Sequence, residues 1–205
     1  MNTTDLKEKN FEADIERYLI TEGGYIKGNQ DTYDKERAID MPVLISFIEK
    51  TQPKQWKRYV TKYGDKAEKQ LYRVFQDDVS RYGLIYVLRK GISDVGINIR
   101  FCYFAPASLL NDELVANYDA NILTVTRQFA YSKLNKNTID MVLSLNGIPV
   151  VALELKKPDY GVRMWRILSV SGAQTETRRN RCFISTTEYW HTSELICMKW
   201  LLLPN

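Results

Sequence analysis

Apolar residues in the first part of the chain recur at helical spacing, and the pattern predicts a helical region over residues 10–83. Asn10 is a plausible N-cap for the first helix, which Gly23-Gly24 would stop. Its predicted apolar stripe is Phe11, Ile15, Tyr18 and Leu19. Further helices are predicted from Asp40-Met41-Pro42 to Thr51-Gln52-Pro53, around Trp56 and Val60 as far as Gly64, and from the capping-box-like Asp65-x-x-Glu68 to Gly83.

The pattern then changes to that of strands, which we expect over residues 84–158. A polar stretch, Ala105–Ala120, interrupts this region, and Pro158 should end its last strand because proline has no N–H for a ladder. Asn146-Gly147 between two β-rich runs is a strong hairpin signal. The predicted strands are Leu84–Arg89, Gly96–Phe104, Asn121–Tyr131, Thr138–Leu145 and Val150–Lys157.

Three charged residues interrupt the apolar hairpin: Asp140, Glu154 and Lys156. Glu154 and Lys156 share a face because side chains alternate along a strand. A two-residue loop alone would pair Asp140 with Leu153 and put the two carboxylates on opposite faces. A loop of odd length, or a bulge, would pair Asp140 with Glu154, with Cβ atoms about 5 Å apart. We predict the odd loop or bulge, since only that register brings both carboxylates to one cation.

This arrangement would suit metal-dependent phosphodiester hydrolysis. Asp140, Glu154 and the backbone carbonyl of Leu155 offer oxygen ligands to Mg²⁺, which prefers them. A bound Mg²⁺ would acidify a water and neutralise charge on the scissile phosphate. Lys156 would orient that water or stabilise the developing negative charge.

The spacing Asp–x13–Glu–x–Lys resembles the PD-(D/E)xK nuclease motif, with Ile139 in place of the proline. A set of segments extends the resemblance to the N-terminal nuclease region of the type I restriction enzyme R subunit. These segments are NFEADIERYLITEGGY, FIEKTQPKQW, VLRKGI, FAPASLLN, YDANILTVTRQFAYS and IDMVLSLNGIPVVALELKKP. The resemblance implies an α/β, restriction-endonuclease-like fold, a mixed sheet flanked by helices with an N-terminal helical region. It also implies a type I site-specific deoxyribonuclease activity.

The resemblance also implies partners: double-stranded DNA, and the methylation and specificity subunits of a type I complex. ATP belongs to a motor that follows the nuclease in that family, and this chain has no G-x-x-x-x-G-K-[ST] loop for it.

The resemblance points to Glu12 as the first-helix glutamate that could face the metal site. The alternative is that Glu12 and Glu16 are ordinary solvated helix charges.

Several basic residues are candidates for DNA contacts. Each has a plainer alternative, a surface turn or a solvated helix face. The candidates are Arg89, Lys90, Arg127 and Lys157, together with the run Lys54, Lys57, Arg58 and Lys62.

Composition adds limits. The chain has 205 residues, of which 44% are hydrophobic and 26% charged, and its net charge of +4 permits polyanion binding without requiring it. The three cysteines lack metal-ligand spacing, and the only histidine is His191, which argues against zinc and histidine-based catalysis. The N-terminus does not resemble a signal peptide, and no apolar run is long enough to span a bilayer, so we expect a cytoplasmic protein without a membrane partner.

The last 45 residues differ in character, so we place a nuclease domain over residues 1–160 and an atypical tail over 161–205. In the family, the Glu-x-Lys strand leads into a helix with Gln-x-x-x-Tyr, which this tail lacks. Codons exist that encode the tail segment VRMWRILSVSGAQTETRRNRCF in one frame and a family-type helix in the next, so we hypothesise a reading-frame slip near Gly161. The functional alternative is therefore an inactive truncated remnant acting as a DNA- or subunit-binding module.

Overall fold

The computed structural model describes residues 3–186 apart from 36, 131–137, 157–163 and 170–184, and it describes side chains between residues 10 and 153 within those limits. A six-stranded mixed sheet has the order β1-β4-β5-β6-β7-β8, in which β1 runs parallel to β4 and the other neighbours are antiparallel. The strands are β1 (Ile26–Lys27), β4 (Leu123–Ala130), β5 (Thr138–Leu145), β6 (Ile148–Lys156), β7 (Met164–Ser169) and β8 (Ser185–Thr186).

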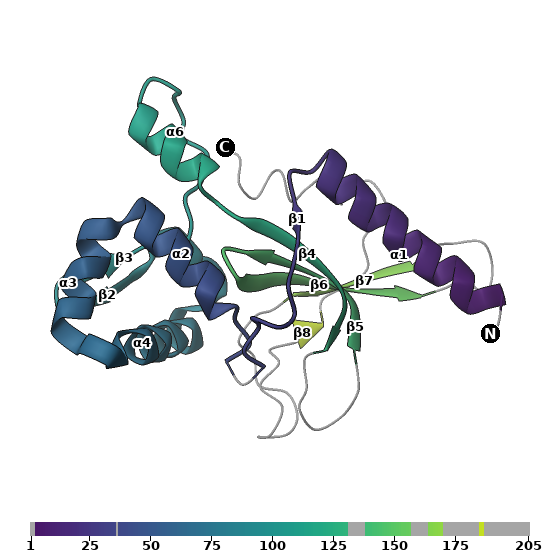
Figure 1. Ribbon diagram of the computed structural model, residues 1–205, viewed down its shortest axis with the longest axis horizontal. Coiled ribbons are helices and arrows are strands. Elements are labelled where there is room, and N and C mark those ends of the chain that lie inside the picture. The colour runs from purple at the N-terminus through teal and green to yellow at the C-terminus, as the bar shows by residue number, and fades with distance from the viewer. Residues whose placement is uncertain (1–2, 36, 131–137, 157–163, 170–184, 187–205) are drawn as a thin grey trace.

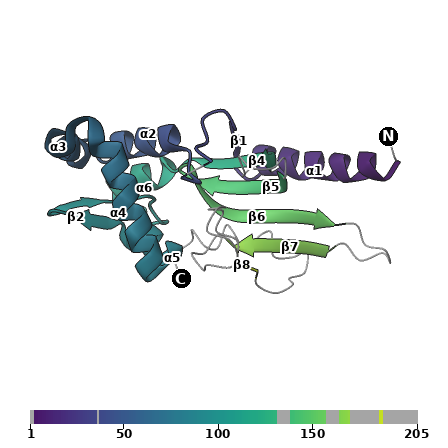
Figure 2. The same ribbon diagram turned by 90° about the horizontal axis from the view of Figure 1, so that it is seen from below.

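Helices lie in two places around this sheet (Figure 1). One long helix, α1, lies alongside the sheet, and a helical lobe sits at one end of it (Figure 2). This arrangement confirms the expected α/β class with a mixed sheet flanked by helices. The helices are α1 (Thr3–Thr21), α2 (Met41–Thr51), α3 (Pro53–Tyr63), η1 (Gly64–Lys66), α4 (Ala67–Tyr82), α5 (Leu84–Lys90) and α6 (Asp112–Asp119), and the lobe also holds the hairpin of β2 (Ile92–Asp94) and β3 (Ile97–Ile99).

The first helix differs from the prediction in its start and in its buried face. It begins at Thr3 rather than after Asn10, and Tyr18 is 62% exposed. Leu19 is buried against β-strand residues, with Phe11 and Ile15 partly buried beside it. The wrong assignment of Tyr18 came from counting only apolar residues, because polar side chains complete the sheet-facing stripe.

The lobe helices α2, α3 and α4 were predicted correctly in number and order. Asp40 caps α2 by accepting a hydrogen bond from the Val43 N–H at 3.3 Å. The predicted capping box at Asp65 is wrong, because a 3-10 turn precedes α4 and Lys66 occupies the N-cap position without a side-chain hydrogen bond.

The segment Leu84–Arg89 was predicted as a strand and is helical. Leu84, Val87 and Leu88 are buried while Ile85 is 53% exposed, and this i, i+3, i+4 spacing is that of a helix. A short, nearly continuous apolar run does not distinguish the two structures. The predicted strand Gly96–Phe104 is only the three-residue β3, and α6, capped by Asn111, occupies part of the stretch expected to be a polar connection.

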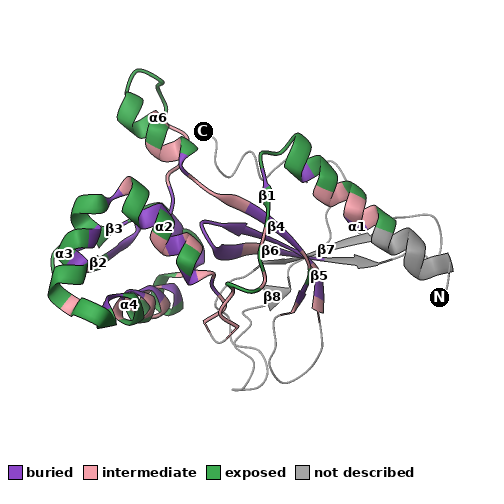
Figure 3. Cartoon of the chain, viewed as in Figure 1, coloured by how far each residue is buried: buried purple, intermediate pink, exposed green. Residues whose placement is uncertain are grey.

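The β5–β6 turn connects the sheet to the lobe. Asn146 has no exposed surface and a positive φ of 51°. Its Oδ1 accepts from the Ile122 N–H at 2.6 Å, and its Nδ2 donates to the Phe101 carbonyl at 2.8 Å and to Asn121 Oδ1 at 3.0 Å. The next residue, Gly147, accepts from the Asp40 N–H at 2.9 Å. The β5–β6 turn is therefore a buried junction and not a surface loop. Figure 3 colours this end of the hairpin as buried.

In the part of the chain that the structure describes, no helix combines the length and apolar character needed to cross a membrane.

The Asn146 junction gives the first testable prediction. Asn146→Ala should lower the free energy of unfolding by about 3–5 kcal/mol, because it orphans two buried backbone groups at about 1–3 kcal/mol each and places alanine at a left-handed φ. Asn146→Gly should recover about 1 kcal/mol of this, since glycine tolerates that φ but replaces none of the hydrogen bonds. Urea unfolding measures both variants, and a loss below 1 kcal/mol for alanine would contradict the account.

Candidate active site

The register of the β5–β6 hairpin sets the position of the predicted acidic pair. Leu145 pairs with Ile148 across a two-residue loop, and Met141 pairs with Leu153 farther along. These two pairs are compatible only because the register shifts at Leu143/Ser144, where Val150 is an extra residue on β6. The predicted bulge is confirmed. Continuing the ladder by one step from Met141 brings Asp140 level with Glu154.

This pair lies at the end of the hairpin opposite its turn, where β5 begins and β6 ends (Figure 2). Asp140 is half-buried. On its other edge β6 continues into a ladder with β7, which places Glu154 opposite Arg166 and Lys156 opposite Met164. Strand alternation keeps Glu154 and Lys156 on one face, but their side chains lie outside the described residues, as does all of Lys157.

The first helix contributes two acidic side chains to the interior. Glu12 is only 4% exposed, and its Oε2 accepts from Nε and Nη2 of Arg127, each at 3.4 Å. The Glu16 side chain is 13% exposed and accepts from Arg127 Nη1 at 3.2 Å. The interpretation of Glu12 and Glu16 as solvated helix charges is therefore wrong. Two carboxylates share one guanidinium, and the second oxygen of Glu16 has no hydrogen-bond partner among the described residues.

Gln128 links this acidic pair to the strand that carries Asp140. Its Nε2 donates to Glu12 Oε1 at 3.0 Å, and its Oε1 accepts from the Thr138 hydroxyl at 3.1 Å. Thr138 is two residues before Asp140, so a chain of two hydrogen bonds runs from Glu12 to the start of β5.

The backbone at Gln128 is unusual for a strand, with a positive φ of 46°. Gln30 holds this kink from the side: its Nε2 donates to the carbonyls of Arg127 and Gln128 at 3.1 and 3.3 Å, and its Oε1 accepts from the Ala130 N–H at 3.2 Å. Strained backbone of this kind is concentrated at functional sites. From the sequence, Arg127 is a candidate DNA contact, but neither Gln30 nor Gln128 is assigned a role.

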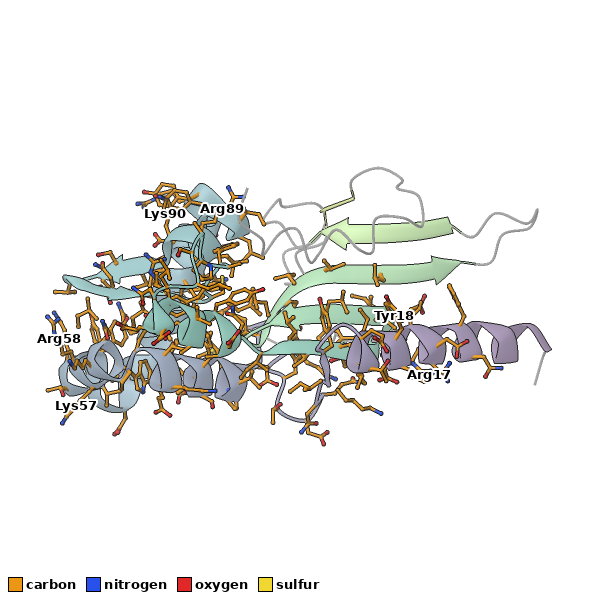
Figure 4. All side chains as sticks on the ribbon, turned by 90° about the horizontal axis from the view of Figure 1, so that it is seen from above. Arg17, Tyr18, Lys57, Arg58, Arg89 and Lys90 are labelled. Carbon is orange, nitrogen blue, oxygen red and sulfur yellow. The ribbon has the colours of Figure 1, made fainter. Side chains whose placement is uncertain are left out.

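The other predicted residues fall into different surroundings. Arg89 and Lys90 are exposed in the last turn of α5 (Figure 4), while Arg127 is engaged by the two glutamates. Burial raises the pKa of the Cys102 thiol to about 12, so this cysteine is no thiolate nucleophile at neutral pH. Among residues with described side chains, no group of three or more histidine, cysteine or acidic residues could hold a metal, and because Glu154 is not among them the Mg²⁺ site stays a prediction.

Arg127 gives a prediction about the buried acidic pair. Arg127→Met should lower the free energy of unfolding by roughly 2 kcal/mol or more, because it leaves the buried Glu12 carboxylate without its cation. Adding Glu12→Gln to Arg127→Met should recover part of this loss, since the amide carries no charge. Urea unfolding of both single variants and the double variant measures this coupling, and purely additive losses would contradict it.

Comparison with protein families identifies a match over most of the chain. The family described as Type I restriction enzyme R protein N terminus matches residues 12–181, which run from Glu12 through the hairpin and into the segment after it. The predicted boundary at residue 160 and the reading-frame hypothesis remain predictions.

Comparison with curated proteins and with solved structures found no significant match. The family match covers 170 residues of the 205 and includes every described residue of the candidate site, from the α1 glutamates to the β5–β6 pair. The chain belongs to the family of N-terminal regions of type I restriction enzyme R proteins.

Proposed function

We propose that this chain is the endonuclease domain of a type I restriction R subunit and hydrolyses DNA phosphodiester bonds with Mg²⁺. The observation that supports this most is the bulge at Val150, which brings Asp140 level with Glu154. A bulge is a specific departure from regular pairing and is over-represented next to active sites. Without it the two carboxylates would fall on opposite faces of the sheet.

The residues present fit the metal. Asp140, Glu154 and the Leu155 carbonyl are all hard oxygen donors, the type that Mg²⁺ prefers, and the bulge register puts the two acidic positions side by side. When bound, the ion would supply charge neutralisation at the phosphate and a lower pKa for a water molecule.

The remaining roles belong to side chains of the chain itself. Lys156, on the same strand face as Glu154, would orient the attacking water or stabilise charge on the phosphate. Glu12 would act on the site through Gln128, which hydrogen-bonds both Glu12 and Thr138, and so would set the position of the strand that carries Asp140. Arg127 would hold both α1 glutamates in place.

The partners follow from the family. Double-stranded DNA would be the substrate, and the methylation and specificity subunits of a type I complex would be the protein partners. The choice of DNA sequence would belong to the specificity subunit. ATP would be used by a motor region, for which this chain has no phosphate-binding loop.

One observation favours a second candidate, a domain that binds DNA or partner subunits without cutting. Where the family resemblance implies a helix after the Glu-x-Lys strand, the described part of this chain forms β7, paired with β6 from Val151 to Lys156. A site without its supporting helix could lose alignment while the lobe and sheet still bind.

A cleavage assay separates the two. The purified chain should nick supercoiled plasmid with Mg²⁺ and not with EDTA, and Asp140→Asn, Glu154→Gln and Lys156→Ala should each reduce the rate by about 100-fold or more. Glu22→Gln removes an exposed charge from the turn after α1 and serves as the matched control, with an unchanged rate. Binding of DNA without any Mg²⁺-dependent nicking would refute the endonuclease proposal and support the binding domain.

A further inference from the structure

The outward face of α3 is strongly basic. The helix reads PKQWKRYVTKY and carries four basic residues and no acidic one. Lys54, Lys57 and Arg58 are exposed, and with 100° between successive residues they fall within a sector of about 100°. We name these three side chains the α3 basic face.

The core fixes the direction in which this face points. Trp56 and Tyr59, at 8% and 0% exposure, lie on the opposite side of the helix and pack into the lobe core. The helix cannot turn the cations inward without exposing both aromatic side chains. Figure 4 shows Lys57 and Arg58 pointing away from the body of the protein.

Hydrogen bonds hold α3 rigidly in the lobe. Gln52, just before the helix, donates from Nε2 to the Arg100 carbonyl at 2.9 Å and accepts from the Arg100 N–H at 2.7 Å. Trp56 Nε1 donates to Glu49 at 3.0 Å, and the Tyr59 hydroxyl donates to Asp94 at 2.8 Å. These hydrogen bonds fix the position of the helix, so the helix itself need not rearrange when the exposed side chains bind a ligand.

The carboxylate beneath the helix is already engaged. Burial on its own raises the pKa of Asp94, but hydrogen bonds from Tyr59, Tyr63 and Gln70 outweigh it and leave that pKa below its ordinary value. Lys62 adds to this lowering and lies over the Tyr63 ring, so it serves the lobe and is not counted in the basic face.

Within the described residues, no carboxylate pairs with the α3 basic face. The ion pairs formed among the described residues involve Arg17, Arg37 and Arg127, none of which lies on α3. A set of exposed cations on one helix face, with no ion-pair partner among the described residues, is the arrangement that binds a polyanion by releasing its counterions. From Lys54 to Arg58 the helix rises about 6 Å, which matches about two phosphates along one strand of duplex DNA.

We propose that the α3 basic face binds the phosphate backbone of duplex DNA away from the cleavage site. The hairpin turn adjoins the lobe, and Asp140 and Glu154 lie at the far end of the same hairpin (Figure 2), so the two contacts with DNA are separate. A compact row of cations on one helix fits the regularly spaced phosphates of DNA better than it fits an acidic protein. The proposal rests on DNA being the substrate, but it needs no catalytic residue.

The test measures duplex binding by fluorescence anisotropy in EDTA, at several salt concentrations, with the full chain. Lys57→Gln/Arg58→Gln should weaken binding several-fold and make the negative slope of log K against log salt shallower by about 2, one for each lost phosphate contact. Thermal unfolding should be unchanged because both side chains are exposed.

The matched control is Lys66→Gln/Lys69→Gln, which removes the same charge from exposed positions of the same lobe. Asp65 and Glu68 alternate with these lysines, so the segment is locally neutral and the control should keep its affinity and salt slope. Equal effects in both double variants, or no effect in either, would overturn the proposal. Unchanged DNA binding together with lost binding to purified methylation and specificity subunits would also overturn the proposal. The α3 basic face would then be a binding surface for those subunits.

Because the measurement uses EDTA, its failure is distinct from a failure of the endonuclease proposal, which shows as missing Mg²⁺-dependent nicking.

Discussion

The register of the β5–β6 hairpin is the constraint on which the rest of this structure depends. It is set at one end by Asn146, whose buried side chain binds the backbone at Ile122, just before β4, and at Phe101, just after β3. It is changed once along its length, where Val150 bulges out of the ladder. A shift of one residue moves every later side chain to the other face of a sheet, so this bulge determines which residues meet Asp140.

Burial of the polar cluster formed by Glu12 and Glu16 of α1 with Arg127 of β4 costs free energy. Burying Glu12 costs free energy that one shared guanidinium offsets only in part, and an apolar contact would stabilise the helix–sheet packing at least as well. The cluster therefore fits a domain in which the position of the strand carrying Asp140 matters more than maximal stability, and the kink at Gln128, held by Gln30, has the same character.

Local signals predicted a large part of this structure. The Asn-Gly dipeptide located the hairpin, the Asp-Met-Pro start located α2, and the need to bring two acids together predicted the bulge. The failures share a physical cause. Leu84–Lys90 is a short apolar run whose period is ambiguous, and the burial of Glu12 depends on Arg127, which lies 115 residues away in the sequence. A sequence pattern reports only on residues that are close together along the chain, whereas these features depend on contacts that exist only after folding.

We propose two sites of different kinds: a carboxylate pair at the open end of the hairpin and a row of cations on the lobe. The proposed chemistry depends on the first site, where Asp140 and Glu154 would bind one divalent ion together. The most direct measurement is diffraction from crystals soaked with Mn²⁺. The account predicts one anomalous peak within coordination distance of both carboxylates, and an ordered hairpin in which the two acids face opposite sides of the sheet, or bind no ion, would contradict it.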